Sequence, residues 1–247
     1  MGKEAEQKQE IVNQGVHTYS QEDSYVWPQE SVLLEQLEWF QDQKLALMVH
    51  WGVYNQLGMV ASWALSDEDA EWSRKMVDWT DDGELFKRQY RALNRAFDPV
   101  AFQPEEWAKM AKECGFRYLI LTTKHHDGFC LWDTAYTEYK TTAEDCPFHT
   151  HKHADIVRAM FEAFRKEGLG IGAYFSKADW HCPDYWEKEK ALTGKTTRNP
   201  TYDPKENPEA WERFRAFTRD QILELGKQYG KLDILWFDAG WVAASNG

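Results

Sequence analysis

Apolar runs alternate along the chain with segments of helical periodicity. Four short apolar runs lie within residues 44–52, 116–129, 169–180 and 232–240, which read KLALMVHWG, FRYLILTTKHHDGF, LGIGAYFSKADW and LDILWFDAG. Because their apolar positions are continuous and do not alternate with polar ones, the runs predict strands buried on both faces, as in a parallel sheet.

Amphipathic segments separate these runs. Pro104 suits the first turn of one helix, and Gly115 suits the residue just after its end. When a helix connects each strand to the next, right-handed crossovers make the strands parallel and give an α/β fold. We therefore expect helices within residues 32–40, 86–97, 104–115, 153–170 and 208–230.

The remaining segments lack a clear period. Residues 53–83 contain the acidic stretches SDEDAE and DWTDDGE and are expected to form a long loop. Residues 181–208 form a second, proline-bearing loop, and residues 1–30 a polar N-terminal arm. Long loops inside a compact domain are usually functional or mobile.

Reactive or aromatic side chains follow the C-terminal end of every predicted strand. In chain order they are His50 and Trp51, then His125, His126 and Asp127, then Tyr174, Ser176 and Lys177, and finally Asp238 and Trp241. The phosphate-binding patterns GxGxxG and GxxxxGK[ST] do not occur in the sequence, which disfavours a doubly wound nucleotide-binding fold. A (β/α)8 barrel gathers its active site at the C-terminal ends of its strands. The pattern therefore favours a TIM-like barrel.

Composition narrows the range of partners. The net charge of −12 disfavours nucleic acid and anionic membranes, which require a basic surface. No apolar run is long enough to cross a membrane and the N-terminus MGKEAEQKQE lacks the apolar region of a signal peptide, so a cytoplasmic location is the default expectation. Four cysteines without a CxxC pair suggest reduced structural thiols. The 13 tryptophans suit either sugar stacking or an aromatic core.

Two kinds of chemistry fit the strand ends. In the first, His50, His125, His126 and Asp238 bind a metal in a barrel hydrolase, although the first strand offers His-Trp and not His-x-His. In the same class, the HTHKH stretch at 149–153 is interpreted as a solvated loop.

The second kind is sugar chemistry. Imidazoles bind hydroxyl groups, tryptophan packs on a sugar face, and a carboxylate attacks the anomeric carbon. A retaining glycosidase uses two carboxyl groups about 5–5.5 Å apart. Purely structural alternatives are a helix N-cap for Asp238, and one buried and one exposed histidine for the pair His125 and His126.

Four stretches, in order and at their spacing, resemble the α-L-fucosidases of glycoside hydrolase family 29. They are HWGVY (50–54), FDPVAFQPEEWAKMAKECGFRYLILTTKHHDGF (97–129), AYFSKADWHCPDYW (173–186) and LDILWFDAGW (232–241). The similarity runs from about residue 38 to residue 242.

The resemblance implies a retaining enzyme that removes terminal α-L-fucose from oligosaccharides or glycoconjugates without a metal or other cofactor. Asp238 corresponds to the nucleophile. His50, His125 and His126 correspond to residues that bind fucose hydroxyls, and Tyr174 to a tyrosine beside the nucleophile.

The sequence departs from the family pattern in three places. Trp63 follows Ala-Ser where the family often has Glu-Trp, and we favour Trp63 over the later pair Glu71 and Trp72 for the sugar contact. Ala239 stands where a glycine usually follows the nucleophile. The family's acid/base carboxylate comes later in the barrel than the nucleophile, and no position up to Gly247 corresponds to it.

This last departure bears on assembly. We expect residues 31–247 to form about the first four strand–helix units of one barrel. Its outer strands would have unpaired edges, which invite pairing with another chain. We therefore expect a complementary C-terminal half or a homo-oligomer as partner. A non-catalytic fragment that acts only through such a partner is the alternative function.

Overall fold

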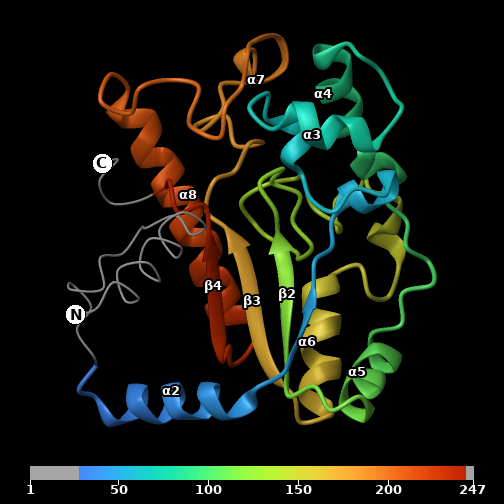
Figure 1. Cartoon of the computed structure of the whole chain (residues 1–247), viewed down its shortest axis with the longest axis vertical. Helices are drawn as coiled ribbons and strands as arrows, with labels where there is room; N and C mark the ends of the chain where they lie inside the picture. Colours follow the sequence, from blue (N-terminus) through green and yellow to red (C-terminus); the bar gives the residue numbers. More distant parts are fainter. Residues whose placement is uncertain (1–27, 243–247) are drawn as a thin grey trace, which may run out of the picture. The chain divides into compact units, whose positions relative to one another are not determined.

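A computed structural model describes residues 28–242 of the chain (Figure 1). The chain divides into two units, Met1–Asp42 and Gln43–Gly247. The described part of the first is mainly α2 (Ser31–Gln43), which confirms the helix expected at residues 32–40. The predicted N-terminal arm lies almost wholly outside the described residues.

The second unit is built on a four-stranded parallel sheet with the strand order β1-β2-β3-β4 (Figure 1). Each strand pairs with its sequence neighbour, as expected for strands that helical crossovers connect. The predicted parallel α/β fold is confirmed, whereas the sheet formed by the described residues is open and not a closed barrel. The strands are β1 (Ala46–Val49), β2 (Tyr118–Lys124), β3 (Gly170–Ser176) and β4 (Ile234–Asp238).

The predicted helices are present, and the segments expected to be irregular are more ordered than their sequence suggested. Residues 53–83 contain a succession of short helical turns, and residues 181–208 contain one. The α-helices of this unit are α3 (Ala70–Ser73), α4 (Gly83–Arg91), α5 (Pro104–Glu113), α6 (Ile156–Lys166), α7 (Lys190–Thr193) and α8 (Pro208–Gln228). The 3₁₀ turns are η2 (Val53–Leu57), η3 (Trp63–Leu65), η4 (Arg74–Met76), η5 (Leu93–Ala96) and η6 (Pro147–Thr150).

Local sequence signals account for where the long helices begin and end. The side chain of Asp155 accepts a hydrogen bond from the Arg158 N–H and caps α6. Pro104 occupies the first turn of α5, where its missing N–H costs nothing. Gly115 follows α5 with a φ of 85°, a left-handed conformation that glycine adopts without strain.

The core lies between the sheet and the helices that cover it. All seven residues of β2 are buried, and α6, whose Met160, Phe161 and Phe164 are buried, packs against β2 and β3. The outer strands differ from the expectation that all four strands are buried on both faces. Met48 of β1 is 43% exposed, and Trp236 of β4 is 48% exposed. An apolar run predicts a strand, but burial also needs neighbours, and β1 and β4 are the edges of this sheet.

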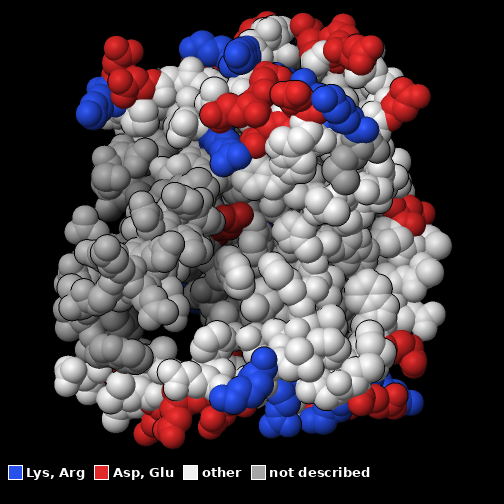
Figure 2. All heavy atoms as spheres, in the orientation of Figure 1, with Lys and Arg blue, Asp and Glu red and all other residues white. Residues whose placement is uncertain are grey.

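Ion pairs hold the long loop in place. Asp67 accepts hydrogen bonds from Lys87 at 2.7 Å and from Arg74 at 2.8 Å. Asp69 pairs with Arg198 at 2.6 Å, which ties residues 53–83 to residues 181–208. Acidic and basic side chains are accordingly intermixed over the region of α3 and α4 (Figure 2).

A buried ion pair between Lys124 and Asp179 lies at the C-terminal end of β2. The Lys124 Nζ donates to Asp179 Oδ2 at 2.6 Å and to Gln221 Oε1 of α8 at 2.9 Å, and it lies 4.6 Å from the centre of the Phe175 ring. Burial alone would raise the pKa of Asp179, but Lys124 holds that pKa below its usual value. The pair joins β2, the loop after β3 and α8 at one point.

Replacement of Asp179 by Asn is expected to destabilise the fold by about 3–5 kcal/mol, because it leaves the Lys124 ammonium buried without a counter-charge. Equilibrium urea denaturation measures the loss. The matched control is Asp220→Asn, whose carboxylate is 31% exposed and pairs with Arg219 at the surface, so its expected loss is under about 1 kcal/mol. Equal small losses in both variants would contradict the assigned role of the buried pair.

Candidate functional site

The C-terminal ends of the four strands bring the predicted site residues together. In the sheet, Val49 pairs with Leu121, and Thr122 pairs with Tyr174. His50, which follows Val49, therefore lies level with Thr122 and Tyr174. His50 Nδ1 accordingly lies 2.8 Å from Thr122 Oγ1, and its ring centre is 5.5 Å from that of Tyr174.

An irregularity in the pairing of β2 directly precedes the two consecutive histidines. The register with β3 shifts by one residue between Thr122 and Lys124, and the Thr123 hydroxyl donates to the Tyr174 carbonyl at 2.8 Å. Such bulges redirect the side chains that follow them and are common beside active sites. Both His125 and His126 are buried, which excludes the alternative of one buried and one exposed histidine.

Asp238 ends β4 and is held by three groups. Tyr174 OH donates to Oδ2, the Ala239 N–H donates to Oδ1 at 2.7 Å, and His126 Nε2 lies 3.4 Å from Oδ2. Burial alone would raise the pKa of Asp238, but His126, Tyr174 and the Ala239 N–H together hold it far below its usual range. The carboxylate is therefore ionised at neutral pH, and its side chain is still 34% exposed.

The hydrogen bonds indicate which nitrogens of the two histidines carry protons. His125 Nδ1 lies 3.4 Å from the Ser62 N–H, which can only donate, so Nε2 carries the proton of the neutral ring. Burial, followed by His126 and His50, keeps the pKa of His125 well below its usual value. His126 Nδ1 lies 3.3 Å from the Ala178 carbonyl, which can only accept, so this nitrogen is a donor.

Tryptophan rings form the walls of the site. The ring centres of Trp63, Trp180 and Trp241 lie 4.9, 4.9 and 5.2 Å from that of His126. The Arg198 guanidinium lies 4.9 Å from the centre of the Trp63 ring, where the cation is attracted to the π face. These rings give the site apolar faces beside its hydrogen-bonding groups, a combination suited to a sugar.

Sequence reasoning missed several of these contacts. Trp180 and Arg198 lie in loops, where no periodicity places them, whereas Trp241 was expected at the end of the fourth strand. Ser62, whose hydroxyl is 2.5 Å from His125 Nδ1, carries no signal of its own. Thr122 could have been predicted as a neighbour of His50, because the parallel register sets the two residues level.

Other candidates from the sequence lie elsewhere. The Glu71 side chain is 91% exposed and pairs with Lys75. In the HTHKH stretch, His149 Nδ1 bonds the Cys146 carbonyl and His151 stacks on Phe148. All four cysteines are free thiols, as expected. Within residues 28–242, no helix is long and apolar enough to cross a membrane.

The backbone after Asp238 is unusual. Ala239 has a φ of 67°, a left-handed conformation that costs a residue with a Cβ atom about 1–2 kcal/mol. This conformation accompanies the hydrogen bond from the Ala239 N–H to Asp238 Oδ1. The strain at Ala239 is therefore stored directly beside the carboxylate, as is common at functional sites.

Replacement of Tyr174 by Phe is expected to shift the pH dependence of any reaction that needs ionised Asp238. Without the phenolic hydrogen bond the pKa of Asp238 rises, so the acid limb of the rate profile moves to higher pH. The plateau rate falls by about ten-fold or more, since a hydrogen bond to a charged group contributes about 1.5–3 kcal/mol. Initial rates from pH 3 to pH 8 measure both effects.

The control for this variant is Tyr54→Phe. Tyr54 lies beside His50 and His125, but its buried hydroxyl has no hydrogen-bond partner among the described residues. Its removal should leave the acid limb in place. An unchanged limb in Tyr174→Phe, or the same shift in both variants, would show that Tyr174 does not tune Asp238.

Comparisons with known proteins relate the chain to one family. The chain is 28% identical over 203 residues to tissue alpha-L-fucosidase from Rattus norvegicus, covering 82% of this chain and 39% of that protein. It is similar to the structure of alpha-L-fucosidase isoenzyme 1 from Paenibacillus thiaminolyticus, with a TM-score of 0.61, 32% identity, and coverage of 83% of this chain and 43% of that one.

A further structure is a trapped covalent intermediate of a GH29 alpha-L-fucosidase from Bacteroides thetaiotaomicron in complex with 2-fluoro-fucosyl fluoride. It matches with a TM-score of 0.63 and 30% identity, over 87% of this chain and 43% of that one. The chain thus spans about two fifths of the length of these relatives. The family model described as Alpha-L-fucosidase matches residues 12–247, and the chain belongs to the alpha-L-fucosidase family.

Proposed function

We propose that this chain carries the nucleophile half of a retaining α-L-fucosidase that removes terminal α-L-fucose from oligosaccharides or glycoconjugates. The observation that supports this most strongly is the environment of Asp238. Its carboxylate is ionised, hydrogen-bonded on both oxygens and partly accessible at the end of a strand, within a cluster of histidines and tryptophans.

In this proposal Asp238 attacks the anomeric carbon of fucose as the bond to the leaving-group oxygen breaks. Tyr174 and the Ala239 N–H fix the orientation of the carboxylate beforehand, so little reorganisation is needed during attack. A fucosyl ester on Asp238 forms, and water then hydrolyses it. The covalent intermediate trapped in the related Bacteroides enzyme supports such an ester.

The other residues bind the sugar. His125, with its proton on Nε2, donates a hydrogen bond to one fucose hydroxyl, and His50 and His126 bind others. Trp63 packs on the C–H face of the ring. Because the pKa values of His50 and His125 lie below their usual value, both rings are neutral at pH 7, and each can serve as donor and acceptor.

A retaining glycosidase also needs an acid/base carboxyl group about 5–5.5 Å from the nucleophile. Among residues 28–242, the His/Cys/Asp/Glu cluster around Asp238 contains only His125 and His126 besides it. The buried Asp127 is engaged elsewhere, since it accepts hydrogen bonds from Tyr90 OH and the Phe129 N–H. We therefore assign the acid/base to the part of a (β/α)8 barrel that would complete this sheet.

Hydrolysis of an aryl α-L-fucoside by the 247-residue chain, with and without azide, tests the proposal. An aryl group leaves with little need of a proton, so slow hydrolysis is expected, whereas natural glycans should turn over poorly. Azide attacks the fucosyl ester without a general base, so it should increase turnover and yield fucosyl azide. Hydrolysis of aryl β-fucosides at the same rate would contradict the proposed specificity.

A metal-dependent hydrolase is the second candidate. One nitrogen each of His125 and His126 and one Asp238 oxygen all lie within 4.8 Å of one another, and the second nitrogen of each ring is engaged. Three such ligands with an open position are typical of catalytic zinc.

Under the fucosidase proposal, removal of metal leaves the rate unchanged. We expect the purified chain to hold less than one equivalent of zinc by elemental analysis. Dialysis against EDTA should change the rate of aryl fucoside hydrolysis by less than two-fold. Loss of the activity, with recovery on adding zinc, would favour the metal-dependent reaction instead.

A further inference from the structure

Three aromatic donors meet at one backbone carbonyl beside the site, that of Arg198, in the loop between α7 and α8. The carbonyl accepts hydrogen bonds from Tyr185 OH at 2.8 Å, Trp241 Nε1 at 3.1 Å and Trp180 Nε1 at 3.4 Å. Trp180 and Trp241 are two of the three tryptophans that surround His126. The reaction proposed above makes no use of Arg198.

The side chain of Arg198 contacts the third tryptophan, Trp63. Its guanidinium carbon lies 4.9 Å from the centre of the Trp63 ring and 5.8 Å from that of the Trp241 ring. A guanidinium within about 6 Å of a ring centre is attracted to the π face of that ring. Arg198 therefore contacts Trp63 and Trp241 through its side chain, and Trp241 and Trp180 through its carbonyl.

Asp69 fixes the plane of this guanidinium. Asp69 Oδ1 accepts from Nη2 at 2.6 Å and Oδ2 accepts from Nε at 3.1 Å, the two-bond arrangement in which arginine binds a carboxylate most firmly. Burial alone would raise the pKa of Asp69, but Arg198 holds that pKa below its usual value, so the carboxylate is ionised at neutral pH. The Arg198 N–H also donates to Glu68 Oε2 at 2.7 Å. The acidic stretch of residues 66–71 thus holds both the backbone and the side chain of Arg198.

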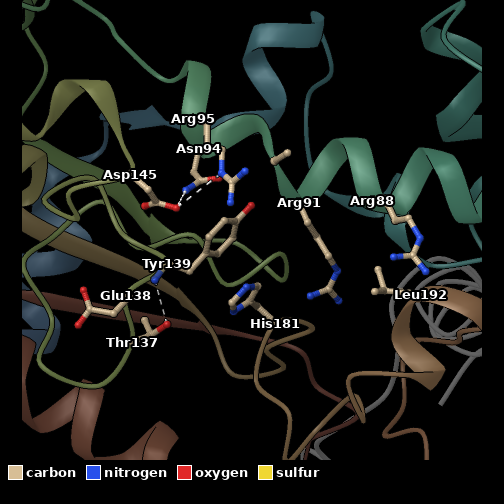
Figure 3. Close-up of a pocket in the computed structure, with 11 residues that line it drawn as sticks. Arg88, Arg91, Asn94, Arg95, Thr137, Glu138, Tyr139, Asp145, His181 and Leu192 are labelled. Carbon is tan, nitrogen blue, oxygen red and sulfur yellow. Dashed lines mark hydrogen bonds and ion pairs between the residues drawn. The ribbon is translucent and has the colours of Figure 1, made fainter.

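Trp180 has anchors of its own. It is fully buried, its N–H donates to the His126 carbonyl at 2.7 Å, and its carbonyl accepts from Arg91 Nη2 at 2.7 Å. Figure 3 shows the Arg91 side chain extending from α4 toward the loop of His181, the residue after Trp180. Trp180 is therefore expected to keep its place when the Arg198 side chain is altered.

Trp63 and Trp241 depend more on the Arg198 side chain. Both rings are only partly buried, and their centres lie 6.1 Å apart. Trp63 begins the short turn η3, and Trp241 lies in the turn after β4, so neither is fixed by the ladder of the sheet. The guanidinium, which Asp69 holds against both rings, is the contact that these two residues share.

From these contacts we propose that Arg198 is a positioning residue that sets the tryptophan walls of the sugar site. Asp69 orients the guanidinium, and the guanidinium holds Trp63 and Trp241 for packing on the sugar. The inference rests on the proposed function, because it takes the sugar to be bound beside Asp238. Ring packing stabilises the ground state and the transition state alike, so loss of the guanidinium should weaken binding without slowing the chemical step.

Arg198→Gln tests this inference with an aryl α-L-fucoside as substrate. We expect KM to rise about ten-fold and kcat to stay within about two-fold of its original value. A variant that was only less stable would contain fewer active molecules, which lowers the apparent kcat and leaves KM unchanged. Asp69→Asn removes the anchor of the guanidinium and should raise KM in the same way.

The matched control is Arg213→Gln. It removes the ion pair of Arg213 with Asp184, which also holds the segment 181–208 but lies on the side of α8. Both kinetic constants should therefore stay as they are in the original chain. An equal rise of KM in this variant would show that any loosening of the loop has the same effect, and would contradict a specific role of Arg198.

A double-variant cycle tests whether Arg198 acts through Trp63. In a Trp63→Leu chain the ring that the guanidinium holds is absent, so Arg198→Gln should raise KM by less than about three-fold. The full ten-fold rise in this background would mean that Arg198 acts on the sugar by another route.

Near-UV circular dichroism separates the inference from the proposed function, because it reports the packing of tryptophan rings and needs no substrate. Arg198→Gln should change the tryptophan bands of the folded chain, and Arg213→Gln should not. If the original chain neither hydrolyses the fucoside nor binds fucose, the function proposed for Asp238 fails, and the dichroism still decides the role of Arg198. Unchanged bands, or an unchanged KM in an active Arg198→Gln chain, would overturn the inference.

Discussion

Replacement of Asp238 by Asn is expected to reduce hydrolysis of an aryl α-L-fucoside by about 10⁴- to 10⁶-fold, the range seen when a residue of a covalent catalytic unit is removed. Asn has the same shape, so packing at the end of β4 is retained. The amide lacks the negative charge and cannot form the ester. Initial rates at saturating substrate measure the loss.

The matched control is the same kind of substitution, Asp to Asn, at a position away from the site. Asp220→Asn makes the same change on the surface of α8, where the carboxylate pairs with Arg219. It should leave the rate within two-fold of the original. A decrease of less than ten-fold in Asp238→Asn would mean that another group performs the attack.

The second large effect concerns assembly. Addition of the C-terminal part of a related enzyme, such as that of Paenibacillus thiaminolyticus, is expected to increase hydrolysis of a fucosylated disaccharide by about 10²- to 10⁴-fold, the usual contribution of a general acid. The added part is expected to pair with the two edge strands of the sheet. On β4, Leu235, Trp236 and Phe237 are each nearly half exposed, and β1 and β4 pair with only one neighbour each among the described residues.

Aryl fucosides should gain less from this addition, because their leaving group requires little protonation. Release of fucose, followed by chromatography, measures the gain for each substrate. The same partner mixed with the Asp238→Asn chain is the control and should give no increase. Co-elution of the two polypeptides without any gain in activity would show that the outer strands do not complete a functional barrel.

The elements of the fold could be predicted because their signals are local. The runs that became β1 to β4 are apolar, and the helices between them begin at capping residues such as Asp155 and end near glycines such as Gly115. The exposure of Trp236 could not be predicted in this way, because the same apolar run serves a central or an edge strand. Burial depends on neighbours that the local pattern does not specify.

The site could be predicted in part for a similar reason. Strand ends in a parallel sheet meet at one edge, so His50, His126 and Asp238 were expected to gather there, and they do. The bulge at Thr123, which precedes the histidine pair, could not be predicted because no sequence pattern indicates it. Trp180 reaches the site from a loop that the ion pair between Lys124 and Asp179 holds, and no local pattern specifies the path of that loop.

The central claim is that Asp238 forms a covalent bond with fucose. The most direct test is incubation of the chain with 2-deoxy-2-fluoro-L-fucosyl fluoride, whose fluoride leaves without protonation, followed by peptide mass spectrometry. The account predicts one fluorofucosyl adduct, on the peptide that contains Asp238, and none in Asp238→Asn. An adduct on a different residue, or no adduct on a folded chain that binds fucose, would contradict it.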